Sequence, residues 1–228
     1  MRALEFRTSG AAGAPAALPP GGKVICVGLN YASHALELGR PLPEHPPVFL
    51  RSWDSLVFHG DDLRMPQVAA SYDFEGEIAA VIGKPAWQVR REDALHHVAG
   101  YTCFMDGSVR EYQLHSIGAG KNFLASGAIG PWIVPAHELP PGGPPRICTR
   151  INGVVVQDAP TSEMAADVAD LLAYCSRWTR LEPGDVIATG TPAGIGSRRK
   201  PPLWLKPGDV VEVEAAGVGV LRNTVATP

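Results

Sequence analysis

Cysteine is scarce in this 228-residue chain, and its spacing fits neither a metal finger nor a redox motif. The four cysteines lie far apart among apolar neighbours, and no C-x-x-C pair occurs: Cys26, Cys103, Cys148 and Cys175. This pattern argues against a disulfide scaffold and against a cysteine-based zinc site. We therefore expect reduced thiols in the core of a cytoplasmic protein.

The chain also lacks a basic excess and any long apolar run. Lysine and arginine number 20 against 23 aspartates and glutamates, a net charge of -3, which argues against a general nucleic-acid binder. No stretch approaches the roughly 18 apolar residues of a membrane span. The N-terminus lacks the continuous apolar core of a signal peptide. We expect a cytoplasmic protein that binds neither nucleic acid nor membrane.

Hydrophobic residues, glycine and proline are abundant. Hydrophobic residues make up 45% of the chain, which predicts a packed core, and 25 glycines with 22 prolines indicate many turns between short strands. Residues 8–22 are rich in alanine, glycine and proline. We predict a loosely ordered N-terminal segment, 1–22, followed by a single domain, 23–228.

Periodicity and turn signals predict a strand-dominated α+β fold with few helices. We expect a buried strand at 24–27, a strand and turn at 48–60, and strands at 72–83 and 101–106, among others. Helices are predicted at 30–40 (closed by Gly39), 90–101 (stopped by Gly100), 107–116 (capped by Ser108) and 162–178. Asn152-Gly153 is a hairpin signal. The similar stretches 181–187 and 205–211 predict two Pro-Gly turns, each followed by a strand.

Three carboxylates alternate in the stretch YDFEGEIAAVIG, Tyr72 to Gly83. Asp73, Glu75 and Glu77 share one face of a strand, so Glu75 and Glu77 can bend toward a common point. Two unpaired anions that close repel each other, and a divalent cation such as Mg²⁺, which prefers oxygen ligands, removes that cost. The alternative is a solvated acidic strand edge. Gly76 between them permits a close approach.

Three further groups of residues carry potential chemistry. Asp106 ends an apolar strand and is followed by Arg110 and Gln113 on one side of a helix, although a lone aspartate there is also typical of a cap. Lys121 precedes an apolar stretch, where a lysine requires an anion; otherwise it is a surface lysine. His34 and Glu37 lie three residues apart, so they can form a general-base pair, or lie on a solvated helix.

The loop ATGTPAGIG offers backbone N–H groups and hydroxyls but no P-loop lysine. Its exposed N–H groups could hold a carboxylate, and a tight turn is the alternative. The relevant members are Thr189, Gly190, Thr191, Gly194 and Gly196.

The order of these motifs resembles the fumarylacetoacetate hydrolase family over about residues 23 to 224. The motifs are VGLNYASHALE, PPVFLR, DFEGEIAAVIG, VAGYTCFMDGSVRE, KNF, GPWIV, INGVVVQ, LEPGDVIATGTPAGIG, LKPGDVVEVE and GVGVLRN. The resemblance implies a mixed β-sandwich roll and a homodimer. It also implies Mg²⁺ or Mn²⁺, with Ca²⁺ as a substitute, held by Glu75, Glu77 and Asp106.

The resemblance further implies a catalytic role for His34 and Glu37 as a water-activating pair on a lid, with Lys121 beside the metal. It places the substrate against Arg110, Gln113, Thr191 and Gly190. The chain departs from many relatives in a shortened segment between Arg110 and Lys121, in Leu124 and in Glu111, which leaves Gln113 and the pocket shape open.

The expected reaction is metal-dependent hydrolysis of a C–C bond in a 2,4-dioxo acid, an acylpyruvate or fumarylpyruvate, through a pyruvate enolate at the metal. Decarboxylation or isomerisation of oxaloacetate or another 2-oxo dioic acid is the alternative on the same site. A non-catalytic binder of metal or 2-oxo acid, a structural calcium site and a ureidoglycolate lyase-type reaction also remain open.

Overall fold

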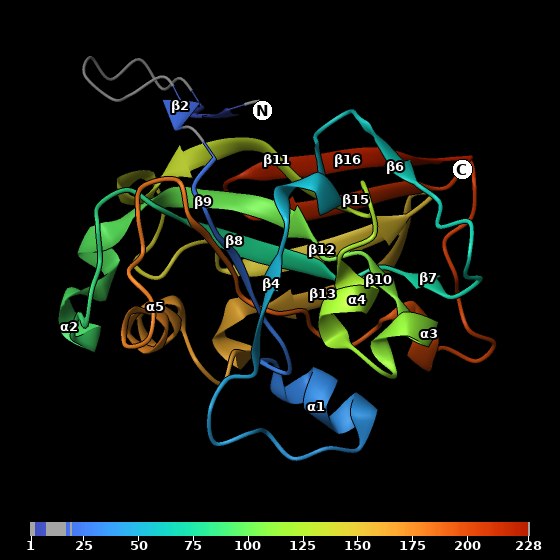
Figure 1. Ribbon diagram of the computed structural model, residues 1–228, viewed down its shortest axis with the longest axis horizontal. Helices are drawn as coiled ribbons and strands as arrows, with labels where there is room; N and C mark the ends of the chain where they lie inside the picture. The colour runs from blue at the N-terminus through green and yellow to red at the C-terminus, as the bar shows by residue number, and fades with distance from the viewer. Residues whose placement is uncertain (1–2, 8–16, 19, 228) are drawn as a thin grey trace.

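Two β-sheets form the body of the protein in the computed structural model, which describes residues 3–7, 17–18 and 20–227. The first has seven strands in the order β4-β3-β14-β8-β9-β11-β5, and the second has five in the order β13-β12-β15-β16-β6. Both are mixed, because β14–β3, β11–β5 and β16–β6 pair in parallel and the other neighbours pair antiparallel. The sheets pack with β12 and β15 against β8 and β9. This confirms the predicted strand-dominated α+β roll (Figure 1).

The bounds of the strands and helices are as follows. The seven-stranded sheet contains β3 (Val24–Val27), β4 (Val48–Arg51), β5 (Leu56–Phe58), β8 (Gly76–Ile82), β9 (Val98–Met105), β11 (Gly127–Pro135) and β14 (Val186–Ala188). The five-stranded sheet contains β6 (Asp62–Arg64), β12 (Arg146–Ile151), β13 (Val154–Pro160), β15 (Val210–Ala215) and β16 (Gly219–Ala226). Two small pairs join β1 (Leu4–Glu5) to β2 (Ala17–Leu18) and β7 (Tyr72–Asp73) to β10 (Ser108–Val109). The α-helices are α1 (Ala32–Leu38), α2 (Arg91–Ala94), α3 (Arg110–Gln113), α4 (Ile117–Lys121) and α5 (Val168–Ser176). Single 3₁₀ turns occupy Trp53–Ser55, Leu95–His97, Ala136–Glu138, Thr161–Glu163 and Gly196–Arg198.

Strand β8 is buried along its whole length, which explains its continuous apolar run. Ile78 and Ile82 lie in the core between the two sheets, whereas Ala79 and Val81 join a second cluster on the other face. Side chains alternate along a strand, so Glu77 points to the same face as Ala79, away from the five-stranded sheet. The acidic end of this strand is therefore placed on the outer face of the large sheet.

The predicted turns and the first helix are confirmed. Helix α1 ends at Gly39, which is left-handed with φ of 64°. Asn152 and Gly153, with φ of 51° and 79°, connect β12 to β13 as a hairpin. The two Pro-Gly turns have Gly184 and Gly208 at φ of 87° and 92°, and each leads into a strand.

The other predicted helices are wrong in length. Residues 90–101 form only α2 and a 3₁₀ turn, because β9 begins at Val98 to pair with β8, so Gly100 lies within a strand. Ser108 does not cap a helix; it lies in β10, and its hydroxyl donates to the Asp106 carbonyl at 2.9 Å. Helix α5 starts only at Val168, because the Asn30 side chain binds both backbone groups of Ala166 ahead of it.

The N-terminal segment falls partly outside the described residues, and so does our prediction of its looseness. Within the described part, β1 pairs with β2 and Leu4 is buried. Three of the four cysteines are buried, Cys148 is half-buried, and all four are free. None of the described helices is long and apolar enough to cross a membrane.

Candidate metal centre and active site

Three carboxylates converge where β8 and β9 lie side by side. Each of Glu75, Glu77 and Asp106 offers an oxygen within 4.8 Å of the other two, and all three residues are buried. Sheet pairing produces this arrangement, because Gly76 lies opposite Met105 and the Asp106 N–H donates to the Glu75 carbonyl at 2.8 Å. The carboxylates are therefore not a solvated strand edge, and the proposed metal ligands are brought together.

Lys121 is buried among these carboxylates. Its Nζ lies 2.7 Å from Glu75 Oε2 and 2.6 Å from Asp106 Oδ2, and it approaches the Phe49 ring at 5.5 Å. Burial by itself lowers the pKa of Lys121, but ionised Asp106 and Glu75 outweigh burial and raise it. Lys121 is therefore held as an ammonium group, which suits charge stabilisation rather than general-base catalysis.

Arg51 is a buried partner of Asp106 for which the sequence analysis predicted no role. Its guanidinium donates to Asp106 Oδ1 at 2.6 Å, the Gly107 carbonyl, both oxygens of Ser55 and the Ser126 hydroxyl. Five contacts match the five N–H donors of arginine. This arginine fixes one oxygen of Asp106 and leaves the other facing Lys121. The signal in the sequence was PPVFLR, where an arginine ends a strand that enters the core.

Glu77 is the least compensated carboxylate of the group. Its Oε2 accepts the Gly190 N–H at 2.9 Å, whereas its Oε1 is buried and unpartnered among the described residues. Burial raises the pKa of Glu77 well above its usual range, with Asp106 and Glu75 adding to the effect. In contrast, Lys121 and Arg110 outweigh burial at Glu75 and lower its pKa to about 2. An orphaned oxygen in an all-oxygen set fits a hard divalent cation such as Mg²⁺ or Mn²⁺.

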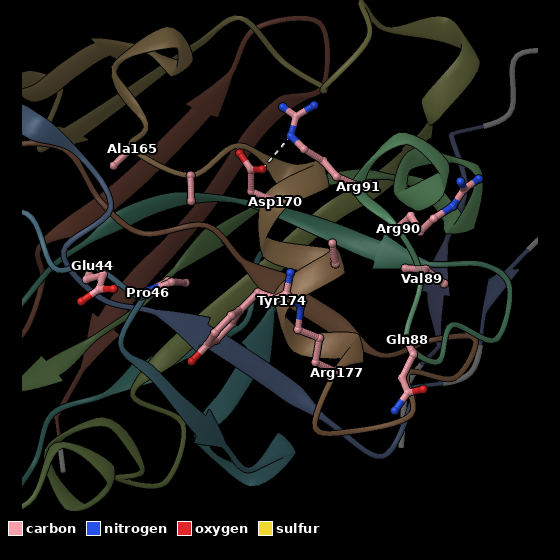
Figure 2. Close-up of a pocket in the computed structure, with 12 residues that line it drawn as sticks. Glu44, Pro46, Gln88, Val89, Arg90, Arg91, Ala165, Asp170, Tyr174 and Arg177 are labelled. Carbon is pink, nitrogen blue, oxygen red and sulfur yellow. Dashed lines mark hydrogen bonds and ion pairs between the residues drawn. The ribbon is translucent and has the colours of Figure 1, made fainter.

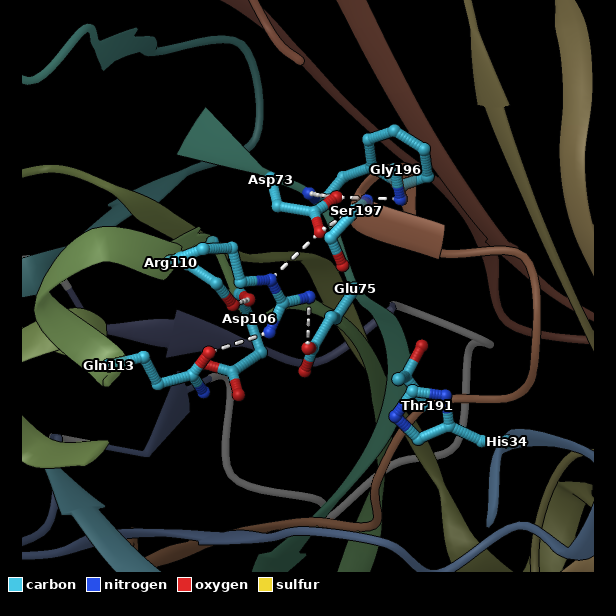
Figure 3. A network of polar contacts seen from close by, with 12 residues as sticks. His34, Asp73, Glu75, Asp106, Arg110, Gln113, Thr191, Gly196 and Ser197 are labelled. Atoms are coloured by element: carbon cyan, nitrogen blue, oxygen red, sulfur yellow. Dashed lines mark hydrogen bonds and ion pairs between the residues drawn. The ribbon is translucent and has the colours of Figure 1, made fainter. Parts of the chain in front are cut away.

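His34 and Glu37 form the predicted pair. His34 Nδ1 lies 3.0 Å from Glu37 Oε2, and His34 is 5% exposed. His34 lies close enough to Glu75 to contribute to the lowered pKa of that carboxylate, and Figure 3 shows its imidazole in one view with Glu75 and Asp106. No described residue hydrogen-bonds to Nε2. A carboxylate that holds Nδ1 fixes the tautomer and leaves Nε2 for proton transfer.

The loop after β14 binds the protein's own carboxylates. The N–H groups of Gly190, Gly194 and Gly196 donate to Glu77 at 2.9 Å, Glu37 at 2.9 Å and Asp73 at 2.7 Å, respectively. The sequence indicated that such N–H groups could hold a carboxylate, and these three are engaged within the chain. One loop therefore connects the acidic cluster, the histidine pair and Asp73.

The residues expected on the substrate side also gather here, although their substrate contacts remain a prediction. Arg110 donates to Asp73, Glu75 and Gln113 at 2.8, 2.6 and 2.7 Å (Figure 3). The Thr191 hydroxyl donates to the Gly76 carbonyl at 2.9 Å and accepts from the Gln157 amide at 2.7 Å. These groups therefore have structural partners in the absence of a substrate.

A cavity of about 750 Å³ lies elsewhere, between α2, α5 and the segment around Glu44 (Figure 2). Two of its arginines are already paired, Arg91 with Asp170 and Arg90 with Asp93. None of the predicted site residues lines it. We therefore assign the chemistry to the acidic cluster and not to this cavity.

The fold and the site together define a class: a strand-dominated protein with a buried carboxylate site for a divalent metal and an adjacent histidine–glutamate pair. The sequence profile of the family described as fumarylacetoacetate (FAA) hydrolase C-terminal matches residues 23–226. The chain belongs to the fumarylacetoacetate hydrolase family, which confirms the resemblance read from the motifs.

Several relatives are similar over most of this chain. Human mitochondrial oxaloacetate tautomerase is 40% identical over 207 residues, covering 89% of this chain and 66% of the relative. The corresponding Xenopus laevis protein is 39% identical, with 89% of this chain and 65% of the relative covered. The chain therefore spans just under two thirds of the length of these curated relatives.

Solved structures support the same family. The fumarylpyruvate hydrolase from Pseudomonas aeruginosa in complex with Mn²⁺ and pyruvate has a TM-score of 0.85 and 29% identity, covering 100% of this chain and 96% of that one. The 5-carboxymethyl-2-hydroxymuconate delta-isomerase from Mycobacterium smegmatis has a TM-score of 0.80 and 35% identity, covering 91% and 80%. The Mn²⁺ in a structural relative agrees with the divalent-metal site inferred from the carboxylates.

Proposed function

We propose that this protein is a metal-dependent tautomerase of oxaloacetate or a closely related 2-oxo dioic acid. The observation that carries the proposal is His34, buried beside the acidic cluster with Nδ1 held by Glu37. The sequence favoured a C–C hydrolase, but several relatives near 40% identity are oxaloacetate tautomerases and support the isomerisation alternative.

The chain's own residues account for the proton movements. His34 Nε2 removes a proton from C3 of the keto acid, and the imidazolium so formed returns that proton to the 2-oxo oxygen to give the enol; the reverse steps convert enol to keto. Glu75, Glu77 and Asp106 would hold a divalent ion, which would supply Lewis-acid stabilisation of the charge that develops during enolisation. The ammonium of Lys121, fixed by Glu75 and Asp106, contributes a second positive charge.

C–C hydrolysis is the second candidate. The similarity to fumarylpyruvate hydrolase supports it, and the same His34–Glu37 pair could instead take a proton from water. The two reactions differ in their products. Tautomerisation leaves all the carbon atoms in one molecule, whereas hydrolysis releases pyruvate and a second acid.

The test follows the ultraviolet absorbance of enol-oxaloacetate with Mn²⁺ present, together with assays for pyruvate and for cleavage of acylpyruvates. We expect faster ketonisation without pyruvate. We expect His34→Gln to lose about 10²-fold or more of the enzymatic rate while still binding Mn²⁺. His137→Gln, at an exposed 3₁₀ turn, is the control. A wild-type protein that cleaves acylpyruvates but does not accelerate ketonisation would replace the proposal with the hydrolase.

A further inference from the structure

Asp73 is the one carboxylate of the alternating series that does not belong to the metal set. It is fully buried, and its Oδ1 accepts the N–H groups of Gly196 at 2.7 Å and Phe74 at 2.8 Å. Its Oδ2 accepts from Ser197 N–H at 3.0 Å and Arg110 Nε at 2.8 Å. Four donors fill the approximately four lone-pair sites of a carboxylate, so Asp73 has none left for a cation.

Arg110 provides the first connection between Asp73 and the acidic cluster. The Arg110 guanidinium bridges Asp73 Oδ2 and Glu75 Oε1, at 2.8 and 2.6 Å, and is 18% exposed. Glu75 Oε1 is thereby fixed, and Oε2 is left at Lys121 on the side of the other two carboxylates. The planar fork of arginine sets both the distance and the angle between the two carboxylates.

The loop after β14 provides the second connection. Asp73 holds the Gly196–Ser197 turn at one end of this loop, and Gly190 at the other end donates to Glu77 Oε2. A Cβ on Gly196 would lie 1.9 Å from the Leu203 carbonyl oxygen and 2.6 Å from Asp73 Oδ1, so these close approaches together require glycine there. Asp73 therefore holds in place the groups that contact two of the three candidate metal ligands: Arg110, which contacts Glu75, and the loop after β14, which contacts Glu77.

We propose that Asp73 is a positioning residue of the metal centre, which sets the geometry of Glu75 through Arg110 and of Glu77 through the Gly190–Ser197 loop. This rests on the divalent-metal site of the proposed function but not on which reaction that site catalyses. Outer-shell partners of this kind typically change metal affinity by about 10- to 100-fold when they are removed.

Asp73→Asn is the direct test. An asparagine keeps the shape of the side chain but replaces one carboxylate oxygen with an NH₂ group. This donor would face the N–H groups of Arg110 or Ser197, which need an acceptor. We expect the dissociation constant of the Asp73→Asn protein for Mn²⁺, measured by calorimetric titration, to rise about 10- to 100-fold.

Asp185→Asn is a matched control. Asp185 is also fully buried and accepts two backbone N–H groups, from Lys23 and Glu182, where Asp73 accepts three; like Asp73 it also has one cationic partner, the Lys23 ammonium at 2.8 Å. It precedes β14, at the end of that strand opposite the loop. We expect it to lower the melting temperature but to leave Mn²⁺ affinity within about threefold of wild type, since none of its partners contacts the acidic cluster.

Arg110→Lys tests the same link without changing charge, should Asp73→Asn not fold. It removes the fork that joins Asp73 to Glu75, and we expect at least a tenfold loss of Mn²⁺ affinity. Wild-type affinity in a folded Asp73→Asn or Arg110→Lys protein, or an equal loss in Asp185→Asn, would overturn the proposal. A wild-type protein that does not bind Mn²⁺ refutes the metal site itself, whereas one that binds Mn²⁺ without ketonising enol-oxaloacetate refutes only the reaction.

Discussion

Glu77→Gln should separate the folding role of the acidic cluster from its metal-binding role. Glutamine can keep the bond from the Gly190 N–H, because its amide oxygen replaces Glu77 Oε2 at 2.9 Å. The NH₂ group then stands where Oε1 is orphaned and faces the remaining carboxylates. The change removes a buried carboxyl group whose negative charge no cation among the described residues would pair directly. We therefore expect the metal-free variant to melt at the same temperature as wild type or higher.

The sign of this effect follows from the pKa of Glu77. Burial raises this pKa above its unfolded value, so the stabilising contribution is present at low pH and is lost as pH rises through the folded pKa. Near neutral pH, the metal-free wild-type protein loses stability through deprotonation of Glu77. The Glu77→Gln variant has no proton to lose at this position and keeps that stability. The effect of Glu75 on the pH dependence of stability has the opposite sign. Its stabilising contribution is present above the pKa of the unfolded state and is lost as pH falls toward about 2.

The rise in melting temperature caused by Mn²⁺ can be given a magnitude. Mn²⁺ at a hundred times its dissociation constant stabilises by about 2.7 kcal/mol, or roughly 5 to 11 °C at about 2–4 °C per kcal/mol for a chain of this size. If loss of an anionic ligand weakens binding about 100-fold, the same Mn²⁺ concentration gives only RT ln 2, about 0.4 kcal/mol, or 1 to 2 °C.

The assay is a thermal melt of wild type and Glu77→Gln, each with and without Mn²⁺. Glu92→Gln serves as control, because its side chain on α2 is 63% exposed and pairs with Arg90 rather than with the cluster. A full Mn²⁺ shift in Glu77→Gln would refute its assignment as a ligand. A metal-free melting temperature about 5 °C or more below wild type would refute the argument that Glu77 is an uncompensated charge.

Three other predictions follow from the same contacts. Mn²⁺ affinity should strengthen as pH rises toward the raised pKa of Glu77, because binding must displace its proton; equal affinities by calorimetry at pH 5.5 and 7.5 would contradict this. Lys121→Met should lower metal-free stability by about 3 kcal/mol in urea melts, the lower end of the cost of breaking a buried ion pair, since Arg110 still pairs with Glu75 and Arg51 with Asp106; Mn²⁺ should restore more stability than in wild type. Gly76→Ala should destabilise by about 1–3 kcal/mol, because a Cβ would lie 1.9 Å from Thr149 Oγ1, and adding Thr149→Ala should recover part of the loss in the same melts.

The sequence predicted the parts of the site whose partners are close along the chain. His34 and Glu37 are three residues apart on a helix, as are Arg110 and Gln113, and both pairs are in contact. The acidic cluster was also predicted, because the order of the motifs added Asp106 to the alternating carboxylates. Local geometry and motif order were sufficient for these positions.

The remaining supports could not be predicted because their partners are distant in sequence. Arg51 and Asp106 are 55 residues apart, and Gly196 and Asp73 are 123 apart. Only the pairing of strands brings them together, and no local pattern encodes it. The helix lengths were wrong for a related reason: tertiary contacts, such as those of Asn30 with Ala166, took backbone groups that periodicity assigned to a helix.

The loop after β14 makes the acidic cluster and the histidine pair parts of one unit. The Gly190 N–H holds Glu77 and the Gly194 N–H holds Glu37, and the two glycines lie four residues apart on the same backbone. A movement of this loop therefore displaces both carboxylates. Polar networks of this kind are worth more than the sum of their pairs, and substitutions within them are not additive. A loss of proton transfer after a change at the acidic cluster is therefore not evidence that the changed residue moves a proton. Only a variant that keeps Mn²⁺ affinity while losing turnover, as expected of His34→Gln, distinguishes the base from its supports.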